Sequence, residues 1–215
     1  MNRQRTIWGV AFSMVAGVTL ISLPFTADAA EQEKVMRAEY TVSKATEVEF
    51  DSGVGEITFE RIEGSVMQVS VRAYKDNDTV FDKDGNVESA ELTARQSGDR
   101  LILEVAEQDG IQLDWVIKLP HLASVEADLG VGEISGELWA SDINIDIGVG
   151  EVDLDIFGDY ASIKTDVGVG DSKIRGIGNI ENNRFLMTAN SRATSNGEAR
   201  ISIDAGVGDV TIRIE

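Results

Sequence analysis

A reversal in the pattern of hydrophobic and polar positions recurs along this chain. Over residues 143–149 apolar and polar residues alternate, which is the period-two pattern of a strand with one buried face. After Gly150 the apolar positions resume at Val152, so the buried parity is reversed. A β-bulge or a tight corner at a glycine produces such a reversal, because it inserts one residue at little steric cost. The pattern therefore predicts a unit of strand, corner and strand.

Five copies of one short phrase carry this reversal. They are Asp51-Ser-Gly-Val-Gly-Glu56, Asp128-Leu-Gly-Val-Gly-Glu133, Asp146-Ile-Gly-Val-Gly-Glu151, Asp166-Val-Gly-Val-Gly-Asp171 and Asp204-Ala-Gly-Val-Gly-Asp209. Successive first glycines are 77, 18, 20 and 38 residues apart, close to four, one, one and two units of about 19 residues. One unit cannot bury its own apolar face, whereas stacked units share backbone hydrogen bonds and a common core. The repeat predicts an all-β fold, a parallel β-solenoid of the single-stranded, right-handed β-helix type with rungs of about 18–20 residues.

The paired glycines of each phrase are expected to be structural. We predict that they form the turns, stacked rung over rung, where a neighbouring rung leaves no room for a Cβ atom. These glycines are Gly53, Gly55, Gly130, Gly132, Gly148, Gly150, Gly168, Gly170, Gly206 and Gly208. The valine between each pair is expected to point inward.

Residues 30–215 are expected to form one solenoid domain, regular in 123–215 and less regular in 31–122. In the less regular part, strands are predicted at 66–74, 90–96, 100–106 and 114–119, with exposed turns at 75–79 and 82–86. These strands are either degenerate rungs or a small antiparallel module. The interval of 77 residues, near a whole number of periods, favours degenerate rungs. No helix of ordinary length is predicted.

The first 29 residues have the features of a secretory signal peptide. A basic start with Arg3 and Arg5 precedes a nearly uncharged stretch over 7–23, and the small-residue pattern Ala27-Asp-Ala29 follows. The alternative is a retained membrane anchor, for which 17 apolar residues are short. We predict a periplasmic or secreted protein with no membrane span after cleavage. The absence of cysteine excludes disulfides, thiolate metal sites and a lipid-bearing cysteine.

The charge balance restricts the partners. The chain carries a formal net charge of −19, with 38 acidic against 19 basic residues. Nucleic acid is excluded as a partner because no basic stripe is available to neutralise phosphates. A cation, a basic partner or a salty habitat fits this charge, and an acidic surface also keeps an exported protein soluble.

The acidic residues of the repeat suggest a cation site. If the copies stack directly, Asp128, Asp146 and Asp166 form one outward column, and a second column holds Glu133, Glu151 and Asp171. A divalent ion such as calcium would relieve the repulsion within such columns. The alternative is that each aspartate caps its own turn and the glutamates are solvated. No other cofactor is expected.

Catalytic chemistry finds little support in the sequence. The single histidine, His121, follows Pro120 without a serine or cysteine motif beside it, so no enzyme is predicted. Trp115 and Trp139 either stack on sugars or fill corners of the fold. The polar segment 182–197 is expected to be a loop that projects from the repeat and carries binding.

The repeated Gly-[Asp/Glu] turn followed by a short Val/Ile strand, behind a signal peptide, resembles the β-strand-repeat "putative adhesin" proteins of bacterial envelopes. That family is largely of unknown function, and the resemblance covers about residues 40–215. It implies a parallel β-helical architecture and an envelope location. It transfers no catalytic residue.

The sequence thus predicts an exported, non-enzymatic envelope protein with a structural or adhesive role, whose partner is an envelope protein or a glycan. The alternatives are a carbohydrate-binding or carbohydrate-processing β-helix and a divalent-cation-dependent matrix protein. The strand over 209–215 is predicted to end the stack with an unpaired edge, because no capping segment follows it. Such an edge would allow self-association.

Overall fold

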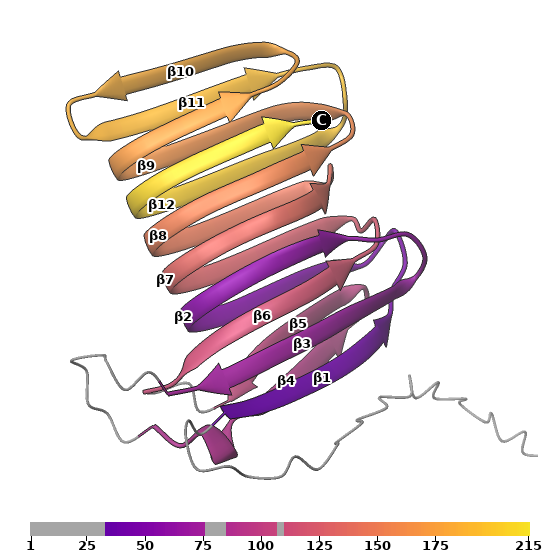
Figure 1. The fold of residues 1–215 in the computed structure, drawn as a ribbon. Helices are drawn as coiled ribbons and strands as arrows, with labels where there is room; N and C mark the ends of the chain where they lie inside the picture. Colours follow the sequence, from indigo (N-terminus) through magenta and orange to yellow (C-terminus); the bar gives the residue numbers. More distant parts are fainter. Residues whose placement is uncertain (1–32, 76–84, 107–109) are drawn as a thin grey trace, which may run out of the picture.

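The computed structural model describes residues 33–75, 85–106 and 110–215, which form an all-β fold (Figure 1). Twelve strands belong to one mixed sheet. They are β1 (Glu33–Thr41), β2 (Glu47–Arg61), β3 (Val66–Tyr74), β4 (Glu91–Ser97), β5 (Arg100–Ala106), β6 (Gln112–Leu119), β7 (Ser124–Trp139), β8 (Asp142–Phe157), β9 (Tyr160–Arg175), β10 (Asn179–Phe185), β11 (Thr188–Thr194) and β12 (Ala199–Ile214).

Helical structure in the described ranges amounts to one 3-10 turn, η1 (Val87–Ser89). None of the described helical residues forms a segment with the length and hydropathy that a membrane crossing requires. The predicted signal peptide, residues 1–29, lies outside the described residues, as does most of the two predicted turns at 75–79 and 82–86.

Five long strands fold back on themselves and stack. β2, β7, β8, β9 and β12 contain 15 or 16 residues each, and Figure 1 shows each of them curving into a U. The first half of β2 pairs with β5 and its second half with β6, so the two halves belong to different layers. Phe50 and Phe59, from the two halves of β2, have ring centroids 5.9 Å apart. The core therefore lies between the two layers.

The Gly-Val-Gly phrase forms the bend of each U. Between β7 and β8 the ladder runs to Leu129 and Ile147 and resumes at Val131 and Val149. The second glycine of the phrase has a positive φ, +147° at Gly132 and +152° at Gly150. A residue with a Cβ rarely adopts this conformation. The predicted corner and the reversal of buried parity are confirmed.

The bends stack in the spatial order β2, β7, β8, β12, β9, in parallel and in register. This order differs from the sequential rungs of a single coil, because β12 is inserted between β8 and β9. The prediction of an unpaired edge at residues 209–215 is therefore wrong, since β12 has a hydrogen-bonded neighbour on both sides. A later strand completes the middle of the stack and does not end it.

The part of the chain before β7 contains antiparallel pairs. β1 pairs with β3, β3 with β6, and β4 with β5, all antiparallel. The strands predicted at 66–74 and 100–106 are confirmed as β3 and β5, and those at 90–96 and 114–119 correspond closely to β4 and β6. Degenerate parallel rungs were the favoured interpretation here, and the antiparallel pairs contradict it. Short connections such as Gly98-Asp99 between β4 and β5 join antiparallel neighbours, because a parallel pair needs a long crossover.

The hairpin of β10 and β11 covers the other end of the stack. β11 pairs antiparallel with the first half of β9, over Ala189–Thr194 and Ser162–Val167. Asn182 of β10 contacts the second half of β9, because its side-chain amide accepts from the backbone N–H of Ile174 (2.9 Å) and donates to the Ile174 carbonyl (3.3 Å). The segment 182–197, predicted as a projecting loop, is instead mostly strand, and it packs on β9.

Candidate functional site: the outer edge of the bends

Glycine columns allow the bends to approach one another. A Cβ on Gly150 would lie 1.7 Å from the carbonyl oxygen of Gly132, and one on Gly148 would lie 2.5 Å from that of Gly130. The same contacts recur along the stack at Gly206 and Gly208. The predicted glycine turns thus lie where expected, with the glycines of β12 between those of β8 and β9.

The valines of the five phrases point outward, contrary to the prediction that they face the core. They form one column in register across β2, β7, β8, β12 and β9. Their exposed fractions are 41% for Val54, 47% for Val131, 48% for Val149, 45% for Val207 and 43% for Val169. The cause is the tight bend, which places Gly130, Val131 and Gly132 in succession on the outside before Ile134 returns to the core.

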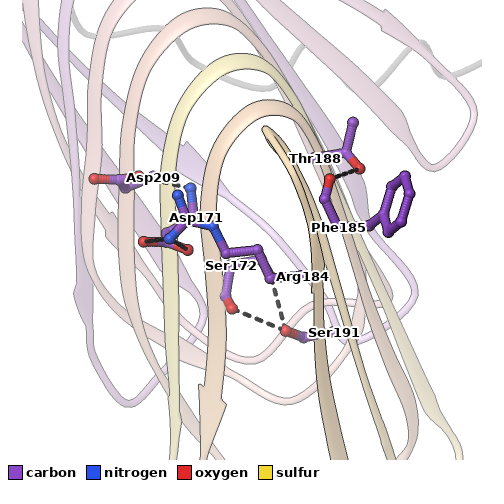
Figure 2. Close-up of polar contacts among 7 residues, drawn as sticks. All are labelled: Asp171, Ser172, Arg184, Phe185, Thr188, Ser191 and Asp209. Atoms are coloured by element: carbon purple, nitrogen blue, oxygen red, sulfur yellow. Dashed lines mark hydrogen bonds and ion pairs between the residues drawn. The ribbon is translucent and has the colours of Figure 1, made fainter.

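The turn between β10 and β11 continues this column. The backbone N–H of Gly170 donates to the carbonyl of Met187 at 2.9 Å, which places the turn beside the bend of β9. Phe185, Leu186 and Met187 are 76%, 80% and 66% exposed. The ring of Phe185 points away from Asp171 in Figure 2. Eight of the eleven exposed large hydrophobic side chains in the described ranges therefore lie along one edge, and we call these five valines and three turn residues the apolar ridge.

Leu186 has a φ of +55°, a conformation that a glycine would adopt with less strain. Placing a leucine there costs free energy and displays a large apolar side chain. The sequence contained a signal for this turn that the prediction did not use, because Phe185-Leu-Met187 is a run of three large apolar residues within the polar segment 179–197.

Two columns of carboxylates flank the apolar ridge. One contains Asp51, Asp128, Asp146, Asp204 and Asp166, and the other contains Glu56, Glu133, Glu151, Asp209 and Asp171. The predicted columns are thus present but longer, and their order is corrected. Asp204 separates Asp146 from Asp166, and Asp209 separates Glu151 from Asp171.

Basic side chains pair with these columns at β9. Lys164 pairs with Asp166, and Arg184 of β10 pairs with Asp171 at 2.5 Å (Figure 2). Asp209 is tied to the same strand, since its Oδ1 accepts from the backbone N–H of Asp171 at 2.8 Å. In the described ranges, no ion pair involves the column residues of β2, β7, β8 or β12. The negative charge of the columns is therefore open over four of the five bends.

Two of the column carboxylates, Asp128 and Glu133, have raised pKa values. The pKa of Asp128 is raised by burial and then by the neighbouring charges of Asp146 and Glu126. The pKa of Glu133 is raised by burial and by Glu56 and Glu151. A cationic group bound between the columns would relieve this repulsion and lower both pKa values.

The glycines make grooves on either side of the valine column. One groove, with a volume of about 840 Å³, follows the first glycines, with the aspartates among its lining residues. The other, of about 510 Å³, follows the second glycines and includes Glu56, Glu133, Glu151 and Asp209. Each groove thus has a glycine floor and a carboxylate wall.

Metal-ion and catalytic arrangements receive no support from the geometry. Among the residues that the structure describes, no group of three or more histidine, cysteine, aspartate or glutamate side chains is arranged to hold a metal ion. The six predicted cation ligands lie side by side along the stack and do not converge. His121 is exposed, and its ring centroid lies 6.2 Å from that of Trp139.

The two tryptophans differ from one another. Trp115 was predicted as a sugar-stacking ring or a filler, and it is wholly buried, with Nε1 donating to Ser52 Oγ at 3.2 Å. Trp139 is half-buried, and its Nε1 donates to the Ile62 carbonyl at 3.1 Å. The Arg61 guanidinium lies 4.3 Å from the Trp139 ring centroid and 3.8 Å from that of Phe157. Both rings therefore act as packing elements, so the platform expected for a carbohydrate is lacking at Trp115.

The fold and its outer edge define a class of protein, the all-β repeat proteins whose bends stack in register along one edge. The chain belongs to the family described as "N-terminal domain of toast_rack, DUF2154", whose model matches residues 26–175. This match ends with β9, so β10, β11 and the inserted β12 lie beyond it. No curated protein matches the chain.

One solved structure agrees with the fold, and a second is similar over part of the chain. A crystal structure of a putative cell adhesion protein from Clostridium sporogenes is similar, with a TM-score of 0.50, 16% sequence identity, and coverage of 86% of this chain and 100% of that chain. A putative adhesin from Parabacteroides merdae matches with a TM-score of 0.29 and 14% identity, over 58% of this chain and 53% of that chain. The predicted relationship to "putative adhesin" proteins is confirmed.

Proposed function

We propose that the chain is an exported, non-enzymatic envelope protein with an adhesive role, built on the stacked bends of the Gly-Val-Gly-Glu/Asp repeat. The observation that carries the proposal is the apolar ridge. Monomeric proteins rarely expose a contiguous row of large apolar side chains without a binding purpose. The adhesion names of the structural neighbours are consistent with this role.

The rigidity of the edge supports binding through the ridge. Each ridge valine is held on backbone paired to the neighbouring bends. A preorganised surface loses little conformational entropy when a partner binds. A partner at the ridge would be an envelope protein or a glycan.

The test compares cells that export the wild-type protein, no protein, or a ridge variant. In the variant, Val131, Val149 and Val207 are replaced by threonine, which has nearly the same shape and a high strand propensity. We expect cell-to-cell and cell-to-surface attachment to fall with the variant as far as with the deletion.

The matched control is Val35→Thr with Val66→Thr, because both valines are 40% exposed and lie off the ridge on β1 and β3. Circular dichroism of the purified variants checks that they fold. Attachment that is unchanged in the deletion strain would refute the adhesive role. If attachment is lost in the deletion strain but retained with the ridge variant, the adhesive surface lies elsewhere on the protein.

A further inference from the structure

We propose that the occupant of the apolar ridge is an extended segment of another polypeptide that carries a row of apolar side chains flanked by lysine or arginine. This inference rests on the proposed adhesive function and names the chemistry of its partner. It follows from three features of the edge: the apolar row, the two glycine-floored grooves beside it, and the open carboxylates along their outer walls.

The dimensions suit an extended chain. Five bends about 4.8 Å apart, with the hairpin turn as a sixth level, span roughly 24 Å. An extended segment of about seven residues has this length at about 3.3 Å per residue. Its apolar side chains would pack on Val131, Val149 and Val207. Lysine or arginine stems would lie in the glycine-floored grooves, since these stems pack well on apolar surface while the charged ends reach outward.

Charge complementarity fixes the sign of the partner. Eight column carboxylates on β2, β7, β8 and β12 have no ion pair within the described residues, whereas both column residues of β9 are paired, to Lys164 and Arg184. Burial and mutual repulsion already raise the pKa of Asp128 and Glu133, so cations placed there interact favourably with a charge that the protein itself leaves unbalanced. The partner must therefore bring the positive charge.

The same charge argues against two other occupants. A second copy docked ridge to ridge would place carboxylate columns opposite carboxylate columns, and like charges in an interface are costly. An anionic lipid surface meets the same repulsion, in a chain of formal net charge −19. A lipid surface also provides no lysine or arginine for the grooves.

The experiment measures binding of fluorescein-labelled 12-residue peptides to the purified protein by fluorescence anisotropy. The probe alternates leucine and lysine. One control alternates serine and lysine, keeping the charge without the apolar row, and another alternates leucine and glutamate. We expect the leucine-lysine peptide to bind at least about tenfold more tightly than either control, and its affinity to fall as salt is raised.

Variants locate the site. Replacement of Val131, Val149 and Val207 by threonine, or of Asp128 and Asp146 by asparagine with Glu133 and Glu151 by glutamine, should each weaken binding about tenfold. The variant with Val35→Thr and Val66→Thr should bind as the wild type does. The inference would be overturned if the serine-lysine peptide bound as tightly as the leucine-lysine peptide. It would also be overturned if the valine variant and the carboxylate variant both bound the leucine-lysine peptide with wild-type affinity.

The other occupants are tested with the same variants. Analytical ultracentrifugation that shows a dimer in the wild type and a monomer in the valine variant would assign the ridge to self-association and overturn the inference. Ridge-dependent cosedimentation with vesicles of phosphatidylglycerol and phosphatidylcholine, without peptide binding, would assign it to lipid and also overturn it.

Failure of the inference is distinguishable from failure of the proposed function. If cell attachment depends on the ridge but the leucine-lysine peptide neither binds nor blocks attachment, the partner chemistry is wrong and the adhesive role stands. If the peptide binds the ridge while deletion leaves attachment unchanged, the adhesive role is wrong and the binding chemistry stands.

Discussion

The two ends of the stack differ in the side chains that close the core, which are apolar at β2 and carry hydroxyls at β9. Phe50 of β2 is in register, through β7, β8 and β12, with Thr165 of β9. Between them lie Ala127, Ile145 and Ile203. On the facing layer, Ile57, Ile134, Val152 and Val210 lead in the same way to Ser172. Both of these ladders begin aromatic or aliphatic and end in a hydroxyl.

At the β2 end the core widens. The ring of Phe50 lies 5.9 Å from Phe59 and 6.2 Å from Trp115 of β6, measured between centroids. Large rings bury more area than valine or isoleucine. The two halves of β2 pair in parallel with β5 and β6, and antiparallel strands follow on each layer. This end therefore carries β1, β3 and β6 on one layer and β4 and β5 on the other.

At the β9 end the core stops. Ser172 Oγ and Ser191 Oγ lie 2.9 Å apart (Figure 2), and Ser191 Oγ also donates to the Ser172 carbonyl at 3.1 Å. Thr165 Oγ1 is hydrogen-bonded to Ser172 Oγ. All three residues are buried. Such a cluster satisfies its own polar groups but offers no apolar surface for a further bend. A stack of repeats thus needs residues that end the core as well as residues that continue it.

The largest effect is expected from Gly150→Ala, which breaks the stack between the two ends. The added Cβ would lie 1.7 Å from the Gly132 carbonyl oxygen, at a φ of +152°. We expect a loss of more than about 5 kcal/mol or failure to fold, measured by urea unfolding. The control is Gly64→Ala, since Gly64 has a φ of +111° but nothing within 4 Å of the added atom. Equal losses in the two variants would refute the stacking explanation.

Phe50→Ala should give the second-largest loss of stability, at the β2 end of the core. Removing a fully buried ring that contacts Phe59 and Trp115 should cost about 3–5 kcal/mol in the free energy of unfolding. Trp115 fluorescence reports the repacking. A comparable loss from Thr165→Ala, in register at the other end, would contradict the contrast between the ends.

Ser172→Val tests the hydroxyl end. It extends the valine ladder of β8 and β12 by one level but removes the hydroxyl to which Thr165 Oγ1 and Ser191 Oγ are both hydrogen-bonded. We expect a loss of about 1–3 kcal/mol in urea unfolding. The triple variant T165V, S172V and S191A removes all three hydroxyls and should recover most of that loss, because no buried hydroxyl is left without its partner. Additive losses in the triple variant would show that the hydroxyls do not act as a unit.

The smallest effect concerns Asp128, which lies between the ends. Burial and Asp146 raise its pKa, so the folded state holds the proton more tightly than the unfolded chain, and stability falls as pH rises above the ordinary value near 4. Asp128→Asn should therefore raise the melting temperature by about 1–2 °C at pH 7, and the gain should vanish toward pH 4. Asp99→Asn, at an exposed turn, is the control. A gain that persists at pH 4 would exclude ionisation as its cause.

The sequence predicted the strands and bends of the stack better than their arrangement in space. The parity reversal at Gly150 identified strand, corner and strand, and the bends and glycine columns follow from it. Thr165 and Ser172 are polar residues at apolar positions of the repeat, a readable sign of the terminating bend. The direction of the bend was not readable, because alternation fixes which side chains share a face but not how many consecutive residues a tight corner exposes. Val149 was therefore predicted inside and lies outside.

The spatial order of the bends could not be predicted for a related reason. The phrases at Asp146, Asp166 and Asp204 are nearly the same, so each can pair with either of the others in register. Local spacing favours the sequential neighbour, yet β12 has β8 on one side and β9 on the other. The β10–β11 hairpin packs on the outer side of β9, and a period count contains no information about such non-local packing. For the candidate site, the sequence indicated the carboxylates, whereas the ridge emerged only from the structure.

The insertion of β12 also constrains the order in which the strands can pair during folding. When β9 leaves the ribosome or a secretion pore, β8 is its nearest partner of matching sequence, and β12 is still 23 residues away along the chain. A direct β8 and β9 pairing would have to open before the native order could form. The native stack is completed only when β12, the last strand, pairs between β8 and β9. Such non-local pairing raises the contact order and slows folding. Delivery of the whole chain before it folds, or a factor that holds β9 aside, removes this kinetic trap.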